Sequence, residues 1–156
     1  MTGEEALNLG IMYYNGALVE QNYNKAFIYF EQAEDLGNQE AYRWIGMYCF
    51  NRTGTFTNEK SFEYFEKALN FNPQDGEVLC YLGLCYENGY GVRKNLKKAF
   101  ESRLQSAEFG WKYAFYEVAF YYLYGYGVEK DLNKALYWAE KYGNKYWINE
   151  IKEKII

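Results

Sequence analysis

The chain has 156 residues, 49% of them hydrophobic, which is enough for one domain with a continuous core, and its 17 basic and 21 acidic residues give a net charge of −4. This balance argues against nucleic acid as a partner, because phosphate backbones are usually bound by clustered Lys and Arg. The chain has no histidine, the commonest general base and metal ligand, and its three cysteines form no zinc-binding pattern, so we expect no enzyme activity, no cofactor and no metal site.

The N-terminal segment MTGEEAL has neither the basic start nor the apolar run of a signal peptide. No apolar stretch approaches the roughly 18 residues of a membrane span. We therefore expect a soluble, cytoplasmic protein that does not bind membranes, and the odd number of cysteines fits a reducing compartment. A removed leader or upstream region would leave no trace in this sequence.

Apolar residues in the first forty positions recur at intervals of three and four, the period of a helix with one buried face. They form two groups, marked by the small residues Gly10 and Ala26 and separated by the turn-forming pair Asn15-Gly16. This pattern predicts two helices joined by a loop. Thr2 and Glu5 have the spacing of a capping box at the start of the first helix.

The same unit recurs three more times along the chain. The small residue of the first helix returns at intervals of 36, 37 and 36 residues, as Gly10, Gly46, Gly83 and Ala119. The small residue of the second helix returns in step, as Ala26, Ser61, Ala99 and Ala135. Self-similarity at such a period is typical of helical repeat arrays. We predict an all-α superhelix, or solenoid, of about four helix-loop-helix repeats, over about residues 2–37, 38–74, 75–110 and 111–143.

Capping residues and helix breakers support these boundaries. Four residues before the small residue of each second helix stands a side chain that can accept a bond from the first-turn amides: Asn22, Thr57, Asn95 or Asp131. The predicted helix ends are marked by Gly37, Pro73, Gly110 and Gly143. The last segment, about residues 144–156, carries an apolar stripe of Trp147, Ile148, Ile151 and Ile155. We predict that it forms a capping helix over the apolar face of the fourth repeat.

Two copies carry a more specific motif. Gly89-Tyr90-Gly91-Val92 precedes Asn95 and Lys98-Ala99, and Gly125-Tyr126-Gly127-Val128 precedes Asp131, Lys134-Ala135 and Trp138. This motif resembles the SEL-one-like repeat, a relative of the tetratricopeptide repeat, and the resemblance covers nearly the whole chain as a single domain, residues 1–156. The first copy departs at Leu18, where a loop glycine is expected. The second lacks the motif and ends in KALNFNP, as an ordinary tetratricopeptide repeat does.

The resemblance implies a concave groove lined by the first helices, in a module that acts as an adaptor or scaffold for other proteins. The groove positions of the family fall on Tyr14, Arg43, Met47, Phe50, Asn51, Glu87, Tyr113, Tyr116, Phe120 and Tyr124. The four aromatic residues of the fourth copy are of the type enriched at protein interfaces, and we expect them to anchor a partner segment. Rings that only fill the space between helices would give the same pattern.

The charges at the predicted groove positions indicate which kind of partner would bind. Arg43 is the one basic groove residue, whereas four groove positions are acidic: Glu4, Glu40, Glu77 and Glu87. A basic or mixed-charge ligand with apolar anchors is therefore favoured over an acidic tail, although solvated surface carboxylates would look the same. Among the cysteines, Cys49 is interpreted as a core substitution and Cys80 as a groove thiol.

Two other functions remain open at this stage. A small acidic repeat protein also suits a dedicated inhibitor, such as a toxin-neutralising immunity protein, which would bind a basic enzyme tightly and one to one. A structural repeat protein would instead associate with itself through its edges. We favour a monomer.

Overall fold

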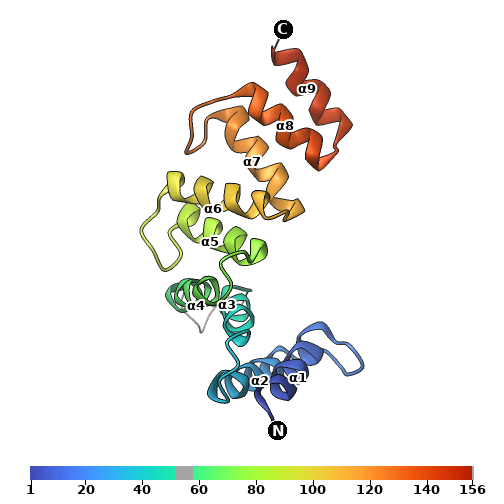
Figure 1. Cartoon of the computed structure of the whole chain (residues 1–156), viewed down its shortest axis with the longest axis vertical. Coiled ribbons are helices and arrows are strands. Elements are labelled where there is room, and N and C mark those ends of the chain that lie inside the picture. The colour runs from blue at the N-terminus through green and yellow to red at the C-terminus, as the bar shows by residue number, and fades with distance from the viewer. Residues whose placement is uncertain (52–57, 156) are drawn as a thin grey trace. The chain divides into compact units, whose positions relative to one another are not determined.

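The computed structural model describes residues 1–51 and 58–155, and these residues form α-helices without any strand (Figure 1). The helices are α1 (Gly3–Asn15), α2 (Tyr23–Asp35), α3 (Ala41–Asn51), α4 (Asn58–Phe71), α5 (Gly76–Asn88), α6 (Leu96–Glu108), α7 (Lys112–Tyr124), α8 (Leu132–Tyr142) and α9 (Lys145–Ile155). The all-α fold class predicted from periodicity is confirmed. Within the described residues, every helix is too short or too polar to cross a lipid bilayer.

The chain divides into two compact units, Met1–Pro73 and Gln74–Ile156. In the first unit α1 packs on α2, α2 on α3 and α3 on α4. In the second unit each helix from α5 to α9 likewise packs on the next one. Because α1 and α2, α3 and α4, α5 and α6, and α7 and α8 are each a hairpin of two packed helices, the predicted helix-loop-helix unit is confirmed.

Side chains cap the helices as their spacing predicts. The Thr2 hydroxyl accepts a hydrogen bond from the Glu5 amide at 3.2 Å, and the Glu5 carboxylate accepts one from the Thr2 amide at 2.8 Å, which completes the capping box. At the starts of α2, α6 and α8 the amide three residues further on donates at 3.0 Å to Asn22, Asn95 and Asp131. The predicted cap Thr57 lies outside the described residues.

The small residue of each first helix allows close packing within the hairpin. A β-carbon placed on Gly10 would lie 2.5 Å from the ring of Phe30, and one on Gly46 would lie 2.7 Å from the ring of Phe65. A side chain at either glycine would collide with these fully buried rings. In the fourth hairpin the residue in the register of Phe30 is Ala139, so the missing ring explains why the larger Ala119 is tolerated there.

The loop of the first hairpin carries the backbone strain that its departure from the motif suggests. Among the described residues, Leu18 is the one non-glycine with a positive φ, 66°, where the fourth copy has Gly127 at 73°. Its side chain is 96% exposed and adds no packing.

Since a β-carbon disfavours the positive φ of Leu18, we expect Leu18→Gly to raise the free energy of unfolding by about 0.5–1 kcal/mol in urea denaturation. The exposed neighbour is the control: Ala17→Gly should not stabilise. A fall in stability of Leu18→Gly would contradict the strain.

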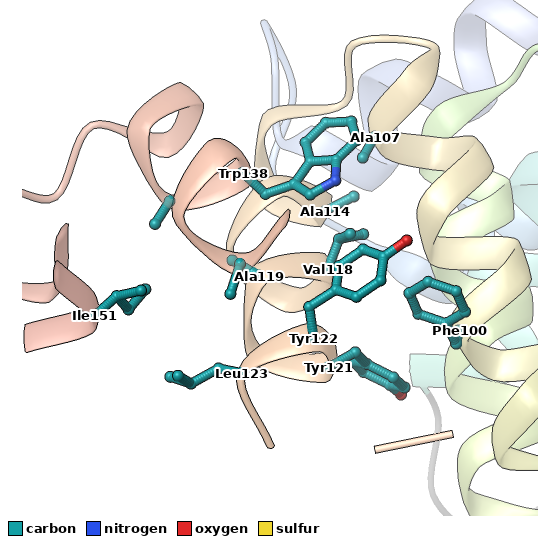
Figure 2. Packing of buried hydrophobic residues seen from close by; sticks show 12 residues of the cluster. Phe100, Ala107, Ala114, Val118, Ala119, Tyr121, Tyr122, Leu123, Trp138 and Ile151 are labelled. Carbon is teal, nitrogen blue, oxygen red and sulfur yellow. The ribbon is translucent and has the colours of Figure 1, made fainter. Parts of the chain in front are cut away.

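The core of the second unit extends from α6 to α9. Figure 2 shows Phe100 of α6 facing Tyr121 and Tyr122 of α7, at ring-centroid distances of 5.9 Å and 5.1 Å. Ile151 of α9 is fully buried, and the half-buried Trp147 and Ile148 pack against the same cluster. The last helix therefore covers the apolar face as predicted. Ile155 is a correction to the predicted stripe, because 41% of its surface is exposed at the end of the helix.

Candidate functional site

Two hollows lie on a surface of the second unit that is lined largely by α5 and α7. The first, which we call the ionic pocket, has a volume of about 180 Å³ and is lined by Glu87, Arg103, Tyr116, Glu117, Phe120 and Tyr121. The second, which we call the Cys80 pocket, has a volume of about 270 Å³ and is lined by Glu77, Cys80, Tyr81, Leu84, Trp111 and Tyr113. We refer to this surface as the α5–α7 face.

Four aromatic residues of α7 make up the aromatic strip of this face. Their exposed fractions are 72% for Tyr113, 44% for Tyr116, 37% for Phe120 and 57% for Tyr124. Neighbouring rings hold them in place, since Tyr116 lies 4.8 Å from Trp147 of α9 and Phe120 lies 4.7 Å from Tyr124, measured between ring centroids. The rings of the strip are therefore accessible to a partner, and packing against neighbouring rings restricts their motion.

A buried cation forms the floor of the ionic pocket. Arg103 projects from α6 with only 2% of its side chain exposed, and its Nη2 atom lies 2.5 Å from Oε2 of Glu87 on α5. Its Nη1 atom contacts Oε1 of Glu117 on α7, and its guanidinium lies over the ring of Tyr121, 5.6 Å from the centroid. Arg103, Glu87 and Glu117 thus connect three helices, and we call them the ionic triad.

The electrostatics of the triad keep Arg103 charged. Burial by itself would lower the pKa of the Arg103 guanidinium, but its neighbours, above all the Glu117 carboxylate, outweigh burial and raise this pKa. A charged guanidinium at this depth is tolerated because two carboxylates contact it.

The ionic triad replaces an aromatic triad of the first unit. Arg103 lies four residues after Ala99, in the register that Phe30 occupies after Ala26. Phe30 packs against Tyr14 and Trp44, at centroid distances of 6.2 Å and 5.6 Å. The positions equivalent to Tyr14 and Trp44 in the second unit are those of Glu87 and Glu117. The same three-helix junction is therefore apolar in one unit and ionic in the other.

Sequence reasoning placed Glu87 on the groove but missed its two partners. Arg103 lies on the second helix of its repeat, and the family resemblance places groove residues only on the first helices. Glu117 lies on α7 between two predicted groove positions. One signal was present, since a charge at the register of Phe30 and Phe65 falls on the buried face of its helix.

The half-buried thiol of Cys80 and the buried thiol of Cys49 are both protonated at neutral pH. The Cys80 Sγ donates a hydrogen bond to Oε2 of Glu117 at 3.1 Å, and burial raises its pKa to about 12. Cys49 is 1% exposed in the core of the first unit, as expected for a core substitution, and burial raises its pKa to about 11. Because the thiolate is the nucleophile, neither arrangement favours thiol chemistry at neutral pH.

The predicted groove residues of the first unit form separate contacts. The Asn51 amide donates a hydrogen bond to the Tyr14 hydroxyl at 3.1 Å, and Phe50 lies 6.1 Å from Phe65 between ring centroids. The Arg43 guanidinium lies 5.5 Å from the centre of the Trp44 ring. Met47 differs from the expectation, because it is only 3% exposed and a buried side chain offers no surface to a partner.

Comparison with known families gives one match along most of the chain. The Sel1 repeat model matches four consecutive segments, residues 6–38, 39–70, 76–101 and 113–141. Each segment covers much of one of the four hairpins seen in the structure.

Two curated proteins are similar to part of the chain. The DAP3-binding cell death enhancer 1 of Rattus norvegicus is 30% identical over 95 residues, which cover 61% of this chain and 18% of the rat protein. The Mus musculus protein of the same name is 28% identical over 95 residues, with the same coverage. The chain therefore spans less than a fifth of the length of these relatives.

Solved structures show the same fold. A Sel1 repeat protein from Oxalobacter formigenes is 23% identical, with a TM-score of 0.76 over 92% of this chain and 60% of that one. The protective antigen c5321 of uropathogenic Escherichia coli strains, which displays an SLR fold, is 24% identical, with a TM-score of 0.77 over 90% of this chain and 30% of that one. At this identity the likeness concerns the fold alone.

Proposed function

The chain belongs to the Sel1 repeat family, and from this membership we propose that it is an adaptor or scaffold that binds a peptide or protein partner on its α5–α7 face. Sel1 repeat proteins are generally protein-interaction modules, and their fold is typically a non-catalytic scaffold. The observation that carries the proposal is the exposed aromatic strip on α7.

The strip has the physical properties of a binding hot spot. Tyrosine combines a large apolar area with a polar tip, and it loses little conformational entropy on binding because it has two side-chain torsions. Tyr116 already packs against Tyr142 and Trp147, at centroid distances of 5.6 Å and 4.8 Å. A surface ordered before binding retains more of the interaction energy.

The charges beside the strip favour a basic or mixed-charge partner. Glu77 lines the Cys80 pocket, and Glu87 and Glu117 line the ionic pocket. Arg103 is the one cation among the residues that line these two pockets. An acidic partner segment would meet like charges here, whereas a basic segment would be attracted.

The relatives point to the same class of ligand. The rat and mouse proteins are named for binding DAP3, and this supports a protein partner for the present chain. Because the chain spans only 18% of their length, we propose a protein partner for it and do not propose DAP3 itself.

The test is affinity capture from an extract of the native cell, with three forms of the chain. In the Tyr113→Ala, Tyr124→Ala form the two most exposed rings of the strip are removed. We expect this form to lose a specific prey, with a loss of about 2 kcal/mol or more in binding free energy if these rings are hot spots. Circular dichroism should be unchanged, because both side chains are exposed.

The matched control removes two exposed tyrosines outside the strip. Tyr137 of α8 and Tyr146 of α9 are 52% and 82% exposed, and the Tyr137→Ala, Tyr146→Ala form should capture the prey as the wild type does. If the strip variant retains the prey at full strength, or if the control loses it equally, the α5–α7 face is not the binding surface.

A further inference from the structure

The geometry points to the ionic pocket as a receptor for one lysine or arginine side chain of the partner segment. This inference rests on the proposed function, since it assigns a ligand chemistry to one part of the α5–α7 face. It is carried by the charge of the pocket, by the Tyr121 hydroxyl that lines it and by the rings at the rim.

The charge of the pocket is not balanced from within. The two carboxylates of Glu87 and Glu117 face the single guanidinium of Arg103, which leaves one excess negative charge. The Cys80 thiol adds none at neutral pH, because burial raises its pKa to about 12. The side chains of Glu87 and Glu117 keep 25% and 28% of their surface exposed, so both carboxylates remain within reach of a ligand. A second cation would complete the charge balance.

The hydroxyl of Tyr121 offers a further acceptor in the ionic pocket. Tyr121 is 3% exposed and lines the ionic pocket, and among the described residues its buried hydroxyl oxygen has the Arg103 guanidinium as a nearby donor but no well-aligned hydrogen bond. Burial raises the pKa of this phenol by more than the nearby Arg103 lowers it, so it stays protonated at neutral pH and its oxygen can accept a hydrogen bond. A hydroxyl oxygen has two acceptor lone pairs, so an incoming ammonium or guanidinium group can donate to it beside Arg103.

The rim and the size of the pocket suit a long basic side chain. Tyr116 and Phe120 line the opening, where their ring faces can contact the aliphatic stem and attract the charged end. The volume of about 180 Å³ is sufficient for one such side chain. Arg103 itself shows that Glu87 and Glu117 accept a guanidinium in this geometry.

The test selects binding peptides from a phage-displayed library of random dodecapeptides on the intact chain. We expect the selected peptides to share a lysine or arginine, and replacement of that residue by norleucine or citrulline to weaken binding by about tenfold. These replacements keep the length of the side chain and remove its charge. The readout is the dissociation constant of each synthetic peptide.

Two tyrosine variants separate the pocket from the core. Tyr121→Phe removes only the hydroxyl and retains the ring that contacts Phe100, so the fold should persist while the basic peptide binds more weakly. The control is Tyr122→Phe, because Tyr122 belongs to the hydrophobic core and does not line the pocket. Figure 2 shows the two rings leaving α7 in different directions. The control should bind the peptide as the wild type does.

A variant of Glu87 tests the contact between the pocket and the basic residue of the peptide by removing a charge from the protein. In Glu87→Gln the penalty for neutralising the basic residue of the peptide should fall from about tenfold to about twofold. Glu101→Gln, which removes an exposed carboxylate of α6 outside the pocket, should leave the penalty unchanged.

The outcomes distinguish this inference from the proposed function. Suppose that the selected peptides lose affinity for the Tyr113→Ala, Tyr124→Ala form. If they share no basic residue, or if neutralising that residue weakens binding equally in wild type and Glu87→Gln, the ionic pocket is overturned as the receptor. The α5–α7 face would still stand as the binding surface. If the wild type retains no peptide above an unrelated helical protein, the result counts against both.

Discussion

Replacement of Arg103 by alanine is expected to lower the free energy of unfolding of the second unit by about 3 kcal/mol or more. The change leaves Glu87 and Glu117 facing each other without their cation, and it empties the space of a side chain that is only 2% exposed. Urea unfolding followed by tryptophan fluorescence is a suitable measurement, because Trp111, Trp138 and Trp147 all lie in this unit. Arg93→Ala, at an exposed arginine, should change stability by less than about 0.5 kcal/mol.

A second variant shows whether the loss comes from the unpaired carboxylates. The triple variant Arg103→Phe, Glu87→Tyr, Glu117→Trp copies the apolar junction of Phe30, Tyr14 and Trp44 into the second unit. Apolar replacements of a buried ion network are often neutral or stabilising, so we expect its stability to return to within about 1 kcal/mol of the wild type. If Arg103→Ala costs no more than Arg93→Ala, the triad does not hold the three helices together.

Replacement of Gly127 by alanine is expected to destabilise the second unit by about 3 kcal/mol or more, through two separate causes. The φ of Gly127 is +73°, which disfavours any residue with a β-carbon. A β-carbon there would also lie 2.2 Å from the carbonyl oxygen of Leu96, a backbone atom at the start of α6 that cannot rotate away. Thermal unfolding followed by circular dichroism measures the loss.

Gly143→Ala is the matched control, because it shares the first cause and lacks the second. Gly143 has a φ of +87°, and a β-carbon placed on it would meet no surrounding heavy atom within 4 Å, so the expected loss is only about 1 kcal/mol of backbone strain. Equal losses in the two variants would show that the contact with Leu96 does not restrict the loop.

The location of the aromatic strip could be predicted, because it depends only on the repeat register. Tyr113, Tyr116, Phe120 and Tyr124 occupy positions of α7 that follow from the place of Ala119 in its repeat, and all four are exposed. Met47 shows the limit of this reasoning. Its register is that of the exposed Phe120, yet it is buried, because burial depends on which side chains surround a position and not on the helical period alone.

The sequence by itself determined the helices, their caps and the hairpins, since these depend on residues close together in the chain. Caps such as Asn22 act over three residues, and the fit of Phe30 against Gly10 joins two consecutive helices. Only the tertiary structure revealed the ionic triad and the buried Tyr121 hydroxyl. Arg103 meets Glu87 and Glu117 from three different helices, and long-range packing, rather than local periodicity, decides which charges become buried together.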